Sequence, residues 1–328
     1  ICISERISDT SSIKLKTIPK LKILITGGAG FIGSNIADEY VRLGHSVTII
    51  DNLSAGSLNN LNGKCRFHNT DILGGDLDKI FKKGKFDVIN HHAAQINPRV
   101  SILNPLADAE TNILATLRLL QLSVKYRIGK FIFASSGGAV YGEQLYFPAS
   151  ETHSLNPISP YGISKLAIEK YLAFYKKYHK LNYVALRYSN VYGPRQSSKG
   201  ESGVVSIFCR QIISGNAPVI NGSGRNTRDF VYVKDVVSAN VKALYFRGSD
   251  IFNISTGTET SILRLTNLII KNLDSRTTVK HAPAVNGEQR RSVISYKKAE
   301  EILGWKTVYG IEDGLAETCD WFRANSEK

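Results

Sequence analysis

LKILITGGAGFIGSNIADEY, residues 21–40, decides the fold of this chain of 328 residues. A short apolar run comes first, then Gly27, Gly30 and Gly33 at three-residue spacing, and then a helical pattern. Glycines so placed permit a tight turn, let backbone N–H groups approach a phosphate, and allow close packing of helix on strand. Because the N-terminus of a helix favours an anion, the stretch predicts a strand–loop–helix unit that binds the pyrophosphate of a dinucleotide.

An acidic residue, Asp51, follows the next apolar run, at the place where a carboxylate accepts hydrogen bonds from the adenosine ribose. Asp51 would repel a 2′-phosphate, and no arginine follows it directly. The sequence therefore favours NAD over NADP, and this context disfavours the alternative of a purely structural glycine-rich turn.

Short apolar runs alternate with amphipathic segments over the first half of the chain. Strands are predicted at Leu21–Thr26, Ser46–Ile50, Cys65–His68, Asp87–His91, Lys130–Ala134 and Tyr183–Leu186. Helices are predicted at Phe31–Leu43, Asp76–Phe81, Asp108–Tyr126 and Tyr161–Tyr178. This alternation predicts an α/β fold, a doubly wound parallel sheet of the Rossmann type with helices on both faces.

From Ser189 onward the pattern changes to loops rich in Gly, Ser and Pro, with isolated helices at Val204–Ser214 and Ile262–Leu273. We therefore expect a smaller C-terminal α/β domain that binds substrate. The expected boundaries are an N-terminal extension at 1–20, an NAD-binding domain at 21–188 with a return segment near 229–254, and a substrate domain at 189–228 and 255–328.

Composition sets limits on the class of protein. Hydrophobic residues make up 42% and charged residues 21% of the chain, which is ordinary for a soluble globular protein and excludes disorder. No apolar run reaches the roughly 18 residues of a membrane span, so no membrane association is expected. Four cysteines lie far apart in the chain without a C-x-x-C pair, which argues against a disulfide framework and against a zinc site. A cytoplasmic location is expected from the cysteines, whose pattern fits a reducing compartment.

The net charge is +14, from 42 Lys and Arg against 28 Asp and Glu. Such an excess is compatible with a nucleic-acid partner, an anionic small substrate or a solvated surface. The lysines are scattered in short pairs with no nucleic-acid motif, so we expect no nucleic-acid partner and assign most of the excess to the surface.

Tyr161 and Lys165 are four residues apart at the start of a predicted helix and therefore share one face. A phenol becomes a base at neutral pH only when positive charge stabilises its anion, and a lysine ammonium supplies such charge. Ser135 and Ser136 end the preceding predicted strand, where a hydroxyl can hold the reacting oxygen. Tyr161, Lys165 and a serine hydroxyl at 135 or 136 together predict general acid–base chemistry at Tyr161.

Several motifs together resemble the extended short-chain dehydrogenase/reductases, in particular the nucleotide-sugar epimerases. These motifs are TGGAGFIG, DNLS at Asp51–Ser54, Asp71-Ile72, HHAA at His91–Ala94, and Asn112, and the likeness extends from Leu21 to Phe322. It implies that His91 and His92 lie in the cofactor wall and are not metal ligands. The implied cofactor-facing positions are Gly27, Gly30, Phe31, Ile32, Gly33, Asp51, Asn52, Ser54, Gly56, Asp71, Ile72, His92, Ala93, Ala94, Gln95, Asn112, Ser135, Tyr161, Lys165, Tyr188 and Val191.

The stretch FASSGGAVYG, from Phe133 to Gly142, resembles the epimerase form of the catalytic loop. By that resemblance Ser136 is the catalytic hydroxyl, together with Tyr161 and Lys165. The related sugar 4,6-dehydratases carry an Asp-Glu pair just after this hydroxyl, where the present chain has Gly137 and Gly138. The resemblance therefore disfavours dehydration.

Four downstream motifs resemble the substrate domain of the same enzymes: RYSNVYGPRQ at 187–196, GESGVV at 200–205, VINGSGRNTRDFVYVKDV at 219–236 and GEQRRS at 287–292. Arginines suit a pyrophosphate because their planar charge binds it bidentately. The implied substrate-facing positions are Ser136, Asn190, Gly203, Val204, Val219, Ile220, Asn221, Arg228, Arg290 and Ser292. A small residue at Ser292 implies a pocket wide enough for a 2-acetamido sugar.

The resemblance implies an NAD-dependent 4-epimerase of UDP-sugars that works through a transient 4-keto sugar, accepts acetylated and plain hexoses, and forms a homodimer. Two alternatives stay open at this point. One is a UDP-glucuronate 4-epimerase or decarboxylase on the same scaffold. The other is a catalytically silent regulator that senses NAD or binds nucleic acid.

Overall fold

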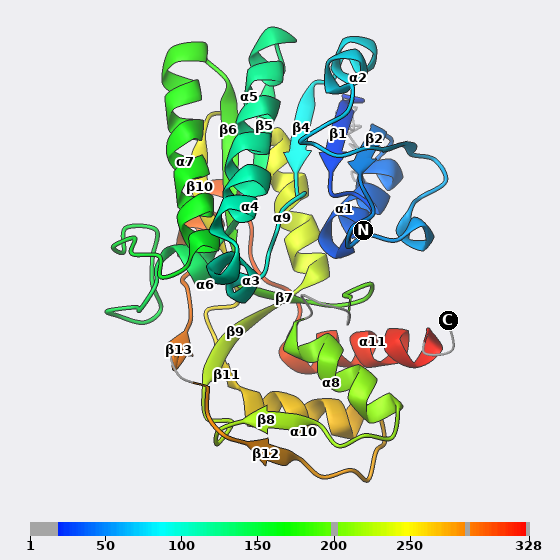
Figure 1. Ribbon diagram of the computed structural model, residues 1–328, viewed down its shortest axis with the longest axis vertical. Helices are drawn as coiled ribbons and strands as arrows, with labels where there is room; N and C mark the ends of the chain where they lie inside the picture. Colours follow the sequence, from blue (N-terminus) through cyan, green and yellow to red (C-terminus); the bar gives the residue numbers. More distant parts are fainter. Residues whose placement is uncertain (1–18, 198–202, 286–288, 326–328) are drawn as a thin grey trace, which may run out of the picture.

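The computed structural model describes residues 19–197, 203–285 and 289–325. Its centre is a parallel sheet of seven strands in the order β10-β6-β5-β4-β1-β2-β3 (Figure 1). The strands are β1 (Lys22–Thr26), β2 (Ser46–Asp51), β3 (Arg66–Asn69), β4 (Val88–His91), β5 (Lys130–Ser136), β6 (Asn182–Tyr188) and β10 (Asp250–Ile254). The order reverses between β1 and β4, and such a switch point opens a ligand crevice at the carboxyl ends of the strands.

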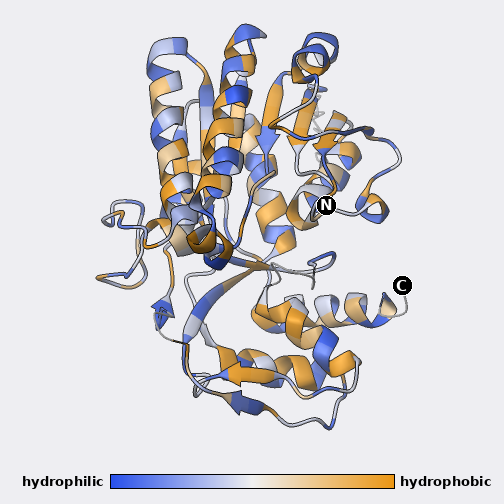
Figure 2. Cartoon of the chain, viewed as in Figure 1, coloured by the Kyte–Doolittle hydropathy of each residue, from blue (hydrophilic) through white to orange (hydrophobic). Residues whose placement is uncertain are grey.

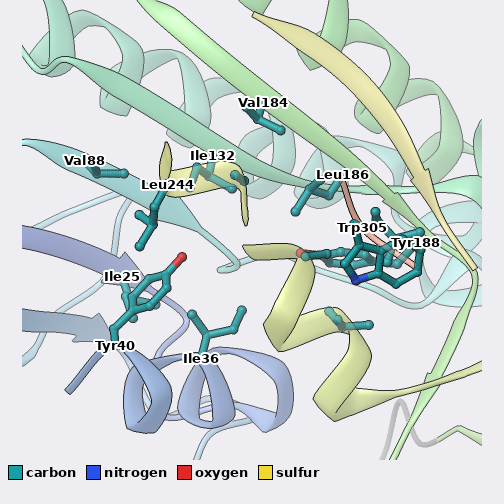
Figure 3. Packing of buried hydrophobic residues seen from close by; sticks show 14 of the residues in the cluster. Ile25, Ile36, Tyr40, Val88, Ile132, Val184, Leu186, Tyr188, Leu244 and Trp305 are labelled. Carbon is teal, nitrogen blue, oxygen red and sulfur yellow. The ribbon is translucent and has the colours of Figure 1, made fainter. Parts of the chain in front are cut away.

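Helices cover both faces of this sheet. The core on one face includes Tyr40 of α1 (Phe31–Arg42) and Leu244 of α9 (Val233–Tyr245), which Figure 3 shows packed against Ile25, Val88 and Ile132. The other face is covered by α2 (Leu77–Gly84), α5 (Ala115–Lys125) and α7 (Pro160–His179). Figure 2 shows the sheet strands as predominantly hydrophobic. The predicted doubly wound α/β fold is confirmed.

The seventh strand, β10, was not among the predicted strands. It lies at the sheet edge beside β6, with Ile251 opposite Ala185 in the register. The chain reaches this edge through α9, after its first excursion into the second region. The return segment expected near 229–254 stays a prediction. The exact domain boundaries remain a prediction.

The second region lies below the carboxyl ends of the sheet strands (Figure 1). Its strand β9 (Thr227–Tyr232) pairs with β11 (Glu259–Ser261), β13 (Arg291–Ser292) and β7 (Asn190–Tyr192). A separate pair joins β8 (Val219–Asn221) to β12 (Lys280–Ala282). Helices α8 (Val204–Ile213), α10 (Ile262–Asn272) and α11 (Ile311–Ala324) share its core.

Short elements complete the chain. The segment predicted as one helix at Asp108–Tyr126 is divided into the end of α4 (Pro105–Ala109), a π-helical turn η2 (Glu110–Leu114) and α5. The others are α3 (Pro98–Leu103), α6 (Gly137–Val140), the 3-10 helix η1 (Leu58–Asn60) and the π-helix η3 (Ala299–Leu303). Among the described helices, none is both long and apolar enough to cross a membrane.

Candidate active site

The glycine loop after β1 is shaped by contacts that only glycine allows. Gly27 has φ +71°, and a Cβ there would lie 2.6 Å from the backbone nitrogen of Ala93. A Cβ on Gly33 would lie 2.3 Å from the carbonyl oxygen of Gly27. Gly30 is the N-cap of α1 and has no side chain to occupy the free N–H groups of the first turn, where Phe31 and Ile32 follow. The loop therefore presents an open helix N-terminus at the switch point.

Asp51 ends β2 and is buried. Its carboxylate accepts hydrogen bonds from the backbone nitrogens of Ala29, at 3.0 Å, and Leu53, at 2.8 Å. A Cβ on Gly56 would come within 3.0 Å of the same carboxylate. The predicted ribose acceptor thus also ties the glycine loop to the turn that follows β2.

Four predicted residues lie in two turns: Asn52 and Ser54 follow β2, and Asp71 and Ile72 follow β3. The Asn52 amide donates to Asp71 at 2.7 Å, and its oxygen accepts from the Ser54 nitrogen at 3.0 Å. Ile72 is buried in the core beneath α2. Asn52, Ser54 and Asp71 form one hydrogen-bonded rim beside the crevice.

The end of β4 separates the two neighbouring histidines. His91 is buried between Thr26 and Thr116, at 2.6 Å and 2.8 Å, so its ring belongs to the core and not to the crevice wall. His92 lies beside the glycine loop and stacks on Tyr188, with ring centroids 6.0 Å apart. In the described part of the chain no group of three or more metal-binding side chains occurs.

Asn112 holds the turn that follows His92. Its amide group pairs with both backbone groups of Gln95, at 3.0 Å and 2.9 Å, and donates to Asp108 at 2.9 Å. The second carboxylate oxygen of Asp108 accepts from Ser164 on α7 at 2.6 Å. Asp108 was not among the site residues predicted from the sequence. The available signal for it was an acidic residue inside a predicted helix with an apolar face. It joins the Ala93–Gln95 turn to the helix of Tyr161 and Lys165.

The two serines at the end of β5 have different surroundings. Ser135 is buried and donates to Glu169 at 2.6 Å, inside a network that contains the buried ion pair of Glu169 with Arg187. Ser136 is half-buried, and its hydroxyl has no hydrogen-bond partner within the described ranges. The hydroxyl of Ser136 is therefore available to a ligand, whereas that of Ser135 is engaged in the core.

Helix α7 begins at Pro160 because Ser159 caps it, accepting from the Gly162 nitrogen at 3.2 Å. Tyr161 lies in the first turn and Lys165 one turn later. The Lys165 ammonium donates to the carbonyl of Ala134 at 2.9 Å and lies 5.7 Å from the centre of the Tyr161 ring. Burial lowers the pKa of Lys165 to about 8. The arrangement places a cation beside a phenol at the carboxyl end of β5.

The second region brings predicted substrate residues together on paired strands. Ser292 on β13 is opposite Arg228 on β9 in the register and is buried. Arg290 is exposed just before β13, and its carbonyl accepts from the Thr227 nitrogen at 2.9 Å. Asn190 on β7 donates to the carbonyl of Asp229 at 3.1 Å. Gly203 and Val204 begin α8, while Val219, Ile220 and Asn221 form β8, and these two elements contribute to one core.

Gly200 to Ser202 and Gly287 to Glu288, which belong to two of the predicted motifs, lie outside the described residues. Val191 on β7 packs between the core beneath α9 and that of the second region. Tyr188 and Val191 therefore connect the two halves of the site.

The residues present fit an NAD molecule. The open N-terminus of α1, the close approach of Gly27 to Ala93 and the acidic end of β2 are the features a dinucleotide requires. In addition, Nδ1 of His92 is buried without a hydrogen-bond partner among the described residues.

Comparison with known proteins agrees with this site. Residues 23–255 match the model of the NAD dependent epimerase/dehydratase family, and the chain belongs to that family. The predicted NAD-dependent enzyme of the short-chain dehydrogenase/reductase type is confirmed at this level.

Three solved structures are similar to this chain over almost its whole length. A Thermotoga maritima UDP-glucose 4-epimerase with UDP-glucose is 42% identical, covers 93% of this chain and 99% of its own, and has a TM-score of 0.91. A Methanobrevibacter ruminantium UDP-N-acetylglucosamine 4-epimerase in complex with UDP-N-acetylmuramic acid is 35% identical, with coverage of 94% and 100% and a TM-score of 0.89. A Thermus thermophilus UDP-glucose 4-epimerase in complex with NAD is 36% identical, with coverage of 92% and 98% and a TM-score of 0.87.

Proposed function

We propose that this chain is an NAD-dependent 4-epimerase of UDP-sugars. The observation that carries the proposal is the placement of Tyr161, Lys165 and the available hydroxyl of Ser136 around the carboxyl end of β5. The similarity to 4-epimerases over almost the whole chain supports the same reaction class.

In this mechanism, Tyr161 takes the proton of the sugar 4-hydroxyl while Ser136 holds the oxygen by a hydrogen bond. The glycine loop from Gly27 to Gly33 and Asp51 would hold NAD, and the cofactor would supply the reversible hydride chemistry at C4 that joins the two epimers through a 4-keto sugar. Lys165, held on the Ala134 carbonyl, stabilises the phenolate of Tyr161. The same residues act in reverse when the hydroxyl re-forms, so no external nicotinamide is consumed.

The nucleotide end of the substrate is assigned to the second region. Arg228 and Arg290 would face the diphosphate, because guanidinium groups bind phosphate oxygens bidentately. Asn190, α8 and β8 would complete the cradle for the uridine. The function assigned here to Arg228, Arg290 and Lys165 accounts for only a few members of the +14 charge excess.

The sugar specificity is a finer part of the proposal. Ser292 is 4% exposed and opposite Arg228, so a larger side chain at this position would fill space beside the diphosphate-binding strand. A serine there would leave room for an acetamido group as well as for the plain hexose. The complex of a 35% identical relative with UDP-N-acetylmuramic acid supports a wide pocket on this scaffold.

Ser292→Tyr tests this specificity. Turnover of UDP-N-acetylgalactosamine should fall at least about tenfold, since a difference of 1–3 kcal/mol is typical for steric discrimination in a pocket, while UDP-galactose turnover is retained. Steady-state kinetics with both sugars measure the ratio. Equal effects on both sugars, or wild-type protein that converts only the unacetylated pair, would contradict the wide pocket.

A homodimer is also proposed. Large apolar side chains are exposed on α3, α4 and α7, with Leu103 85% and Tyr178 62% exposed. On α7 the spacing of Ile163, Tyr171, Phe174 and Tyr178 places them along one side of the helix. Light scattering should give twice the mass of one chain, and Phe174→Glu should shift the protein to monomers.

The experiment for the main proposal supplies UDP-galactose, UDP-N-acetylgalactosamine and UDP-glucuronate separately, without added NAD. Formation of the 4-epimers of the first two supports the proposal. Conversion of UDP-glucuronate alone would instead favour the alternative enzyme, and no conversion with salt-dependent DNA binding would favour the regulator.

A further inference from the structure

His91 and His92 are adjacent on the chain, but their rings lie in separate hydrogen-bond chains. Successive residues of a strand point to opposite faces of the sheet, which sends His91 toward Thr116 and His92 toward Tyr188. Each chain ends on a backbone carbonyl, which can only accept a hydrogen bond. The position of the proton on each ring can therefore be worked out from that fixed end.

The series of hydrogen bonds through His91 ends at the backbone carbonyl of Asn112. The Thr116 hydroxyl lies 2.8 Å from this carbonyl and must donate to it, so the same hydroxyl accepts from Nε2 of His91. Nδ1 of His91 is then an acceptor, and the Thr26 hydroxyl donates to it at 2.6 Å. His91 therefore carries its proton on Nε2.

The series of hydrogen bonds through His92 ends at the backbone carbonyl of Val236. The Asn240 amide nitrogen lies 2.8 Å from this carbonyl, which fixes the orientation of the amide group, and its second proton goes to the Tyr188 hydroxyl at 2.9 Å. The Asn240 oxygen accepts from Asn90 at 3.0 Å, in agreement with this orientation. The Tyr188 hydroxyl therefore accepts from Asn240, and it donates its own proton to Nε2 of His92 at 3.1 Å.

His92 must then accept on Nε2 and carry its proton on Nδ1. That nitrogen is buried and has no partner among the described residues, although a buried donor without an acceptor is costly. The backbone of His92 borders Gly27, at the centre of the dinucleotide cradle. An oxygen atom of the bound cofactor is the acceptor that this position calls for.

We infer that His92 is a neutral Nδ1–H donor to an oxygen atom of bound NAD, and that Asn240 is a positioning residue that fixes this tautomer through Tyr188. Burial and, to a smaller extent, the nearby charge of Lys165 support the neutral form, because together they lower the pKa of His92 to about 3. A neutral ring also avoids repulsion with the cationic nicotinamide. The inference rests on the NAD site and is independent of the identity of the sugar.

The first test is nitrogen NMR of protein labelled with ¹⁵N-histidine. The protein has seven histidines, so the spectrum contains few signals. The signals of His92 are assigned by their loss in His92→Phe. At neutral pH His92 should show a protonated Nδ1 and an unprotonated Nε2, and His91 should show the opposite pattern as an internal control. The same tautomer on both rings, or a doubly protonated His92, would overturn the inference.

The second test uses Asn240→Leu, which frees the Tyr188 hydroxyl to accept from His92. We expect the Nδ1–H form of His92 to lose its dominance, while His91 keeps its pattern. An unchanged His92 tautomer would show that Asn240 does not fix it. If Asn240→Leu does not fold, Tyr188→Phe removes the same link and gives the same readout.

The third test measures NAD binding directly, by titration of cofactor-stripped protein. His92→Phe keeps an aromatic ring that can stack on Tyr188 but removes the donor, so NAD affinity should fall about tenfold. NAD should also shift the Nδ1 signal of wild-type His92. Unchanged affinity together with an unshifted signal would overturn the contact with the cofactor, even if the protein is an active epimerase.

Discussion

The cofactor side of the site and the nucleotide-sugar side are built differently. At the ends of β1, β2 and β4, the side chains that shape the cradle are already paired with backbone groups of the neighbouring loops, as Asp51 is with the Ala29 nitrogen and Asn112 with both backbone groups of Gln95. On β9 and β13, Arg228 and Ser292 are brought together by strand pairing between distant parts of the chain. The exposed Arg290 precedes β13.

From this difference we expect the cofactor cradle to be fixed before a ligand arrives, and we propose that the diphosphate supplies part of the order on the substrate side, where Arg290 is exposed. A cofactor that stays bound through each cycle benefits from a preformed site. A substrate that must leave benefits from charged groups that remain solvated in its absence. Substitutions on the two sides should therefore have separable effects on NAD content and on KM.

The largest effect is expected for Tyr161→Phe, at the border of the two sides. Removal of the general base should lower kcat about 10³-fold, while NAD content and nucleotide affinity are retained. Turnover of UDP-galactose and the NAD released on denaturation measure these quantities. Activity near that of the wild type would contradict the assignment of Tyr161.

Gly27→Ala tests the rigidity of the cofactor side. The added Cβ lies 2.6 Å from the Ala93 nitrogen at φ +71°, so both crowding and backbone strain act against it. Crowding and strain together cost about 3 kcal/mol of binding free energy, so NAD affinity should fall about 100-fold. Gly63→Ala is the matched control, because a Cβ there meets nothing within 4 Å. Equal NAD affinity of the two variants would show that the cradle is not preformed.

Arg228→Met tests the substrate side. We expect KM for UDP-galactose to rise about tenfold or more with a small change in kcat, because the lost charge–phosphate contact is made throughout the reaction. NAD content should stay at the wild-type level. Loss of NAD in this variant would show that the two sides are not separable.

The smallest effect concerns Lys165, which lies between the two sides. Its pKa in the folded protein is lowered to about 8 from the ordinary 10.5 by burial. Between these values the unfolded chain holds a proton that the folded chain has lost, so the contribution of Lys165 to the free energy of unfolding rises with pH. Denaturant unfolding of cofactor-free protein from pH 7.5 to 10 should show this rise. Lys165→Met should lack it, and an identical pH dependence in both would contradict the shift.

The sequence predicted the strand–loop–helix unit and the strands around it because their signals are local. Gly27 to Gly33, Asp51 and the alternation of strands and helices lie within short windows whose spacing has a direct physical meaning. The six predicted strands correspond to β1–β6 within a few residues. The seventh strand, β10, was missed because its place beside β6 depends on where the chain returns after α9.

Long-range partners could not be predicted from spacing. The resemblance singled out Ser136 as the catalytic hydroxyl, but no spacing indicates that Ser135 donates to Glu169 or that Asp108 joins Gln95 to Ser164. Likewise Cys209 and Cys319, distant in the chain, have sulfur atoms 3.9 Å apart between α8 and α11. Each of these contacts depends on the packing of separate elements.

The central claim is reversible hydride transfer between C4 of the sugar and bound NAD, with Tyr161 as the base for the 4-hydroxyl proton; it is tested most directly with UDP-galactose that carries deuterium at C4. The labelled sugar is given to purified protein without added NAD, and the product is analysed by mass spectrometry and NMR. The proposal predicts UDP-glucose with the deuterium still at C4. Loss of the deuterium to solvent, or a requirement for external nicotinamide in stoichiometric amounts, would contradict it.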